Sequence, residues 1–239
     1  GGKILLVLPE LPETGRGWRF QSPSVLFTAP ASGAPSATAS FDSVSRTLTL
    51  TTADATMAQA TRHVFTISNV HTPSSIVNAT TMQATVRDST NKNIDTTSGM
   101  IVDQIVAGRF TGARSFDTAK DTPGVKDTAT LSFTPTGTIH VGGSIEIVMP
   151  ILTGVQSQWS FEAPSASWKT PSTSVPTAQS TTWNAATRTL IIVVATNDIV
   201  TNVAQVIEVT NVRTPSSTVN ANNVVVTSKD SKGNAIDGP

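Results

Sequence analysis

Residues 1–9, GGKILLVLP, recur as residues 142–150, GGSIEIVMP. Further matches are NVHTPSS at 69–75 with NVRTPSS at 211–217, and DSTNKNID at 88–95 with DSKGNAID at 230–237. The offset is 141 residues at first and 142 later, so one residue is inserted between Pro176 and Trp183. A repeat of this length corresponds to a whole domain rather than to one turn of a solenoid. Residues 1–98 therefore correspond to residues 142–239.

The repeated segments have the composition of β-strands. Residues 144–149, 188–194 and 205–212 are rich in Val, Ile and Thr and alternate partly between apolar and polar. The matching segments of the first copy are 3–8, 46–51 and 63–70. Polar runs at 88–93 and 230–234 are typical of turns between strands, and no stretch has a sustained helical period. The sequence predicts an all-β chain of two tandem immunoglobulin-like antiparallel β-sandwich domains.

The repeat also predicts the domain boundaries. We expect a first domain at residues 1–107 that lacks its first strand, and a second at residues 108–239 with its first strand at about 128–134. Nothing ahead of Gly1 corresponds to that strand. One interpretation is that the sequence is a window from a longer tandem array. The alternative is an exposed groove that accepts a strand from a neighbouring chain.

The segment that joins the two copies, residues 99–141, contains both apolar and glycine-rich stretches. We expect its apolar run at 100–102 to continue the last strand of the first copy. The later part, residues 109–126, is expected to be a hinge between the domains.

Composition excludes several classes of function. Lys plus Arg and Asp plus Glu both total 16, so the chain lacks the positive charge that nucleic-acid binding requires. Without cysteine there are no thiolate metal sites or Cys nucleophiles. No apolar run approaches a membrane span, and no catalytic motif is present. We therefore expect a protein that is not an enzyme and has no cofactor, no catalytic residues and no nucleic-acid partner.

One run, LSFTPTGTIHVGGSIEIVMP at 131–150, carries a resemblance to a known class of repeats. It is similar to the tandem immunoglobulin-like repeats of large cell-surface and filament proteins of microbes, including protists, such as the mastigonemes on algal flagella. The resemblance implies a structural segment of an extracellular filament, appendage or cell-surface stalk, whose partners are neighbouring repeats or subunits. The alternative is an adhesin or carbohydrate-binding module that binds glycans.

Aromatic residues occupy matching positions in the two copies. The matched pairs are Trp18 with Trp159, Phe20 with Phe161, Phe27 with Trp168, and Phe41 with Trp183. Large rings at matching positions are typical of a sandwich core, where each buries much apolar area. The other interpretation is that Trp168 or Trp183 is exposed and contacts a sugar or a filament neighbour.

Two further features predict surface chemistry. Asn78-Ala79-Thr80 is an acceptor sequence for N-glycosylation, which the second copy lacks. Aspartates near the turns and in the joining segment are Asp88, Asp95, Asp117, Asp121, Asp127, Asp230 and Asp237. Clustered carboxylates can bind calcium, but this spacing is not that of a calcium loop, and Asp is an ordinary turn residue. We expect glycosylation at Asn78 and no metal ligands, with calcium as the alternative.

Overall fold

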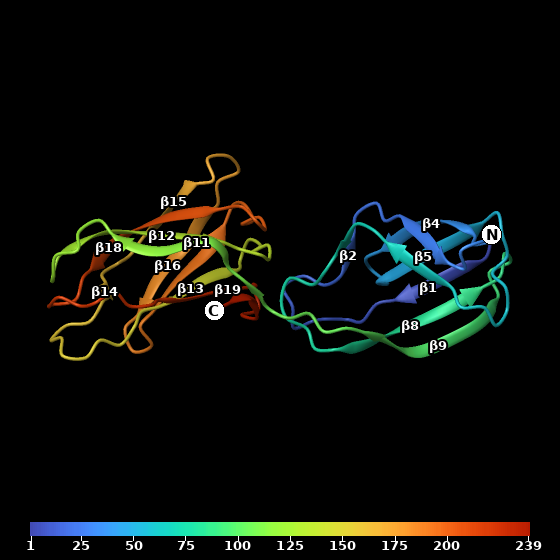
Figure 1. Cartoon of the computed structure of the whole chain (residues 1–239), viewed down its shortest axis with the longest axis horizontal. Helices are drawn as coiled ribbons and strands as arrows, with labels where there is room; N and C mark the ends of the chain where they lie inside the picture. Colours follow the sequence, from blue (N-terminus) through green and yellow to red (C-terminus); the bar gives the residue numbers. More distant parts are fainter. The chain divides into compact units, whose positions relative to one another are not determined.

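The computed structural model describes all 239 residues, Gly1–Pro239. The fold is all-β, and every strand pair is antiparallel except β10 with β20 (Figure 1). The chain forms two compact units. Unit 1 comprises Gly1–Pro12, Arg16–Pro73 and Val77–Ile105, and unit 2 comprises Glu13–Gly15, Ser74–Ile76 and Val106–Pro239. The prediction of an all-β chain with two sandwich domains is confirmed.

Unit 2 is a sandwich of two sheets. One sheet has the strand order β10-β20-β19-β13-β17-β16, and the other has the order β11-β12-β18-β14, with β15 also paired to β18. The strands are β10 Gly108–Arg109, β11 Thr111–Thr118, β12 Lys126–Thr134, β13 Ser144–Val148, β14 Ser160–Phe161, β15 Ala166–Thr170, β16 Thr177–Asn184, β17 Thr189–Ala195, β18 Gln205–Arg213, β19 Val225–Lys229 and β20 Ala235–Gly238.

Alternating side chains build the core of unit 2. In β13, Ile145 and Ile147 are buried while their neighbours are only half-buried. Leu131 and Phe133 of β12 belong to the same buried cluster, so the two sheets share one core. Burying each such side chain contributes about 1.5–3 kcal/mol. A slip of one residue would turn these side chains outward, so the core also fixes the register of the strands.

Unit 1 has one large sheet, of order β4-β5-β1-β8-β9, and two strand pairs, β2-β7 and β3-β6. The strands are β1 Lys3–Val7, β2 Arg19–Phe20, β3 Val25–Ala29, β4 Ser36–Asp42, β5 Thr47–Ala53, β6 Val64–Ile67, β7 Val70–His71, β8 Thr80–Arg87 and β9 Asn93–Val102. Its fully packed core is small, and consists of Ile4, Leu6, Phe27, Leu48 and Leu50.

The sequence repeat is also a structural repeat. The order β4-β5-β1-β8-β9 in unit 1 matches β16-β17-β13-β19-β20 in unit 2. Arg46 and Arg188 both adopt left-handed backbone conformations, with φ of 54° and 53°. Each donates its Nε–H to a backbone carbonyl, that of Leu8 at 3.3 Å and that of Met149 at 3.2 Å. The two copies therefore share turn geometry as well as strand order.

Two local expectations were wrong. Residues 63–70 do not form one strand, because Ser68 and a left-handed Asn69 separate β6 from β7. Residues 109–126 are not simply a hinge, because Thr111–Thr118 within them form β11, which pairs with β12. Phe116 gives the physical reason, since its ring packs against the core of unit 2 and holds β11 on the sheet.

Candidate functional site

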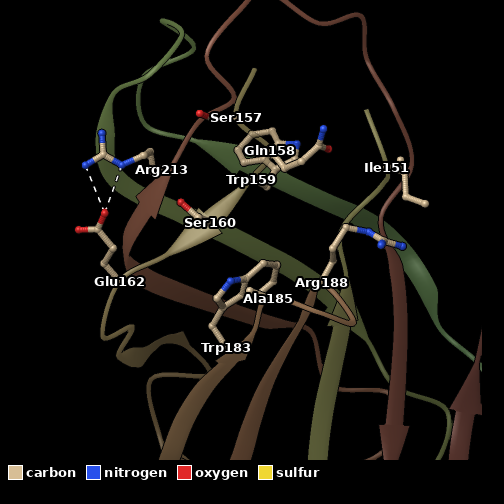
Figure 2. A pocket seen from close by; sticks show the side chains of 10 residues that line it. All are labelled: Ile151, Ser157, Gln158, Trp159, Ser160, Glu162, Trp183, Ala185, Arg188 and Arg213. Atoms are coloured by element: carbon tan, nitrogen blue, oxygen red, sulfur yellow. Dashed lines mark hydrogen bonds and ion pairs between the residues drawn. The ribbon is translucent and has the colours of Figure 1, made fainter. Parts of the chain in front are cut away.

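A pocket of about 560 Å³ opens on unit 2 (Figure 2). Figure 2 shows Trp159 and Trp183 on two sides of it, with Arg188 on one flank and the Glu162–Arg213 pair on the other. The remaining lining residues are Ile151, Ser157, Gln158, Ser160 and Ala185. The lining thus combines aromatic rings with charged and polar groups, so it offers both stacking surfaces and hydrogen-bonding groups.

The two indole rings of the pocket are held by the core beneath them. Trp183 lies in β16 and packs on Phe161 at a centroid distance of 4.6 Å. Trp159, just ahead of β14, meets Phe116 edge to face at 6.0 Å. Both tryptophans are half-buried. Aromatic packing therefore orients each ring while part of its surface stays accessible to a ligand.

Glu162 is neutralised by two cations. Its Oε2 lies 3.0 Å from Nζ of Lys126, and its Oε1 lies 3.3 Å from both Nε and Nη2 of Arg213. The hydrogen bond and charge of Lys126, with the charge of Arg213, lower the pKa of the Glu162 carboxyl below its ordinary value. Glu162 is therefore ionised at neutral pH and its charge is balanced within this group.

Arg188 is the cation of the pocket that has no carboxylate partner. Its Nε–H is bonded to the Met149 carbonyl, which leaves the terminal nitrogens of the guanidinium without a protein partner. The matching Arg46 of unit 1 has Glu10 at 3.7 Å. Ile151 takes the place of Glu10 in unit 2. A planar guanidinium that is free on this edge can bind a carboxylate or sulfate group.

The residues predicted from sequence do not gather in one place. Trp183 lines the pocket. Trp168 is 8% exposed and belongs to the core, where its Nε1–H donates to Oε1 of Gln205 at 3.2 Å. Asn78 is exposed and belongs to unit 1, two residues ahead of β8.

Sequence reasoning missed the roles of Trp159, Glu162 and Arg188 in the pocket. Trp159 was recognised only as a core aromatic. A signal was available in the differences between the copies, because Glu10 is replaced by Ile151, Gln21 by Glu162, and His71 by Arg213. These substitutions change the charge of one region while the surrounding strands stay the same.

The aspartates of the turns bind backbone groups. Asp88 Oδ1 accepts the N–H groups of Thr90 and Lys92 at 2.8 and 2.9 Å. Asp230 Oδ1 accepts those of Lys232 and Asn234 at 2.9 and 3.0 Å. No group of three or more His, Asp and Glu side chains is placed to hold a metal ion. The two aspartates thus make equivalent turns in the two copies.

Similarity to known proteins is found only among solved structures. Neither a scan against protein-family models nor a search of curated proteins gives a match. Among solved structures, the chain is similar to the C-terminal domain of the antigen I/II-family protein AspA of Streptococcus pyogenes, with 10% identity and a TM-score of 0.29 over 99% of this chain and 82% of that one. It is also similar to the serine-rich repeat adhesion glycoprotein Srr1 of Streptococcus agalactiae, with 11% identity and a TM-score of 0.24 over 83% and 70%. No helix in the chain has the length and apolar character needed to cross a membrane.

Proposed function

We propose that this chain is a structural tandem-repeat segment of an extracellular filament, appendage or cell-surface stalk, and that its role is not enzymatic. The observation that carries the proposal is the structural repeat. Two copies in one chain share strand order, left-handed arginines and aspartate-capped turns. Repetition of a whole sandwich domain extends a chain with units of the same fold, which is what a spacer requires.

The composition supports the same proposal. Each sandwich is stiff because hydrogen-bonded sheets share a close-packed core. Charged residues make up only 13% of the chain, so lateral packing of such units desolvates few charges. The partners we propose are neighbouring repeats or subunits of the same filament. We also propose that Asn78, which is exposed, carries an N-linked glycan on the surface of unit 1.

Immunogold microscopy tests the proposal. Antibodies raised against the purified chain are applied to intact, unpermeabilised source cells, and to permeabilised cells as a control for hidden antigen. We expect gold particles on intact cells, along an appendage or surface layer. Label that appears only after permeabilisation would overturn the extracellular assignment.

A second candidate function is carbohydrate binding by the pocket of unit 2. Trp159 and Trp183 offer indole surfaces, and Arg188 offers a free guanidinium. Sugar rings stack on indoles through their apolar faces, while acidic substituents pair with arginine. We propose a saccharide that carries carboxylate or sulfate groups as the ligand class.

A glycan array with matched variants tests this second candidate. We expect the unmodified chain to bind acidic glycans, and Trp183→Ala to lose at least about tenfold in affinity, as expected for removal of an aromatic anchor. Phe41→Ala is the control, because Phe41 occupies the matching position in unit 1. Equal losses in both variants, or no binding by the unmodified chain, would exclude the pocket as a sugar site.

A further inference from the structure

The edge strands of unit 1 are paired on one side only. β6 pairs with β3, and β7 pairs with β2, and neither has a partner on its other edge. In unit 2 the matching strand, β18, is paired on both edges, with β14 and β15 on one side and β12 on the other. Backbone groups of an antiparallel strand alternate between its two edges. Half of those in β6 and β7 therefore face an edge with no strand.

The side chains along this edge are more exposed than their counterparts. Val212 of β18 is 1% exposed, whereas the matching Val70 of β7 is 38% exposed. Ile207 is completely buried, whereas the matching Phe65 is only half-buried. The apolar pattern of a strand with a neighbour is thus retained in unit 1, although no neighbour covers it.

In unit 2, β12 covers the strand edge that is open in unit 1. Leu131 lies opposite Ile207, and Phe133 lies opposite Gln205. Both Leu131 and Phe133 are at most 2% exposed and belong to the main core. No segment of unit 1 supplies side chains at the corresponding place. The open edge of β6 and β7 is therefore a partly apolar edge, with the register that pairs with β12 in unit 2.

Thr72, just after β7, and its counterpart Thr214, just after β18, differ in a similar way. The Thr214 hydroxyl donates to the carbonyl of Thr122 at 2.7 Å, and the Thr214 N–H donates to that of Val125 at 3.0 Å. These bonds hold the residues that lead into β12. The matching Thr72 of unit 1 is exposed. It provides a polar anchor for a segment of the same kind.

We propose that the open edge of β6 and β7 is a binding site for an extended strand of the type of Lys126–Thr134. The strand runs antiparallel to β6, places apolar side chains in the positions of Leu131 and Phe133, and enters from the N-terminal side of Gly1. In unit 2 the donor strand reaches β13 through residues 135–143, and β1 is the counterpart of β13. A donor strand joined to β1 by a similar segment ahead of Gly1 can therefore lie beside β6 as β12 lies beside β18. This inference does not depend on the proposed extracellular role.

Hydrogen exchange tests strand binding at this open edge directly. Residues 122–141 are copied and fused ahead of Gly1 of the full chain, and exchange is measured by mass spectrometry in peptides that cover β6 and β7. We expect amides on the open edge to exchange about tenfold or more slowly than in the unfused chain, because they gain backbone partners. The matched control carries Leu131→Asp in the added copy only, and should give little protection.

Any of the following results would contradict the proposal. If the fused strand gives no protection, or if the Asp-bearing copy protects equally, then the open edge does not select this strand. Sedimentation of the unfused chain is measured in parallel. A dimer whose β6 amides are already protected would show that a second copy pairs with the open edge, and would overturn the assignment to a strand ahead of Gly1. Because these measurements use purified protein, their failure is distinct from a failure of the immunogold experiment.

Discussion

Trp168 of β15 donates its indole N–H to the side-chain oxygen of Gln205, the first residue of β18, and both side chains are buried. In unit 1 the matching pair is Phe27 and His63, whose rings meet edge to face at 6.3 Å. One copy therefore fills this position with a hydrogen-bonded pair and the other with an aromatic pair.

Removing the indole donor should destabilise unit 2. Trp168→Phe introduces the residue that unit 1 uses, but it leaves the Gln205 oxygen without its partner in a buried place. We expect a loss of about 1–3 kcal/mol in the free energy of unfolding, measured by denaturant titration. The double variant Trp168→Phe/Gln205→Leu should recover part of it, since the buried oxygen of Gln205 is then removed with its partner, although the Val203 carbonyl loses the bond from Gln205 Nε2. No recovery would show that the loss comes from packing alone.

The stability of unit 2 should fall in acid because of Asp230. Burial raises the pKa of the Asp230 carboxyl, but hydrogen bonds from the Ser75 hydroxyl and from the N–H groups of Gly15, Asn234 and Lys232 outweigh burial and lower it. A lowered pKa adds stability above the ordinary aspartate value of about 3.9. That stability is lost as the pH falls below this value through the lowered one.

Melting temperatures measured from pH 7 to pH 2.5 test this dependence. Asp230→Asn should lower the melting temperature at pH 7 and flatten its decline below pH 4, because the group no longer titrates. Asp88→Asn is the comparison. The pKa of Asp88 is also lowered, by hydrogen bonds from the Lys92 N–H and the Thr90 hydroxyl, but Asp88 is more exposed, so we expect a smaller effect on the melting temperature. If Asp230→Asn leaves the fall of the melting temperature in acid unchanged, another carboxyl controls that fall.

Chelation should leave both units unchanged. The Asp237 oxygens accept bonds from the Gly137 N–H at 3.2 Å and from the Ser228 hydroxyl at 3.1 Å, and those of Asp230 are similarly occupied. Carboxylates engaged in this way have few lone pairs left for a cation. We expect EDTA to leave the melting temperature unchanged. A fall of several degrees that calcium reverses would establish the alternative of a calcium-stiffened repeat.

The core position of Leu131 predicts a large effect of truncation. Leu131→Ala removes a side chain that is 1% exposed, and should cost about 2–5 kcal/mol through lost burial and a residual cavity. Leu26→Ala is the control, because Leu26 is 67% exposed and its loss should change stability by no more than about 0.5 kcal/mol. Similar losses in both variants would contradict the placement of β12 in the core.

The fold was predictable because its signals are local or repeated. Alternation in residues 144–149 predicted β13, and the match of residues 88–95 with 230–237 predicted equivalent turns. The interruption at Asn69 was not predictable in this way. The matching Asn211 has a similar left-handed φ, yet β18 continues through it. Pairing with β12 is present along β18 and absent along β6, and such a neighbour is not visible in the local sequence.

The candidate site depended on tertiary structure for a related reason. Sequence alone determined that aromatic rings recur at matching positions, and that Asn78 lies in a glycan acceptor motif. Only the folded chain decided that Trp168 lies in the core while Trp183 borders a pocket with Trp159. The folded chain also shows that Arg188 has no carboxylate partner, whereas Arg46 lies beside Glu10. Exposure and charge pairing are set by residues distant in sequence, so alternation within a strand specifies a face but not what covers it.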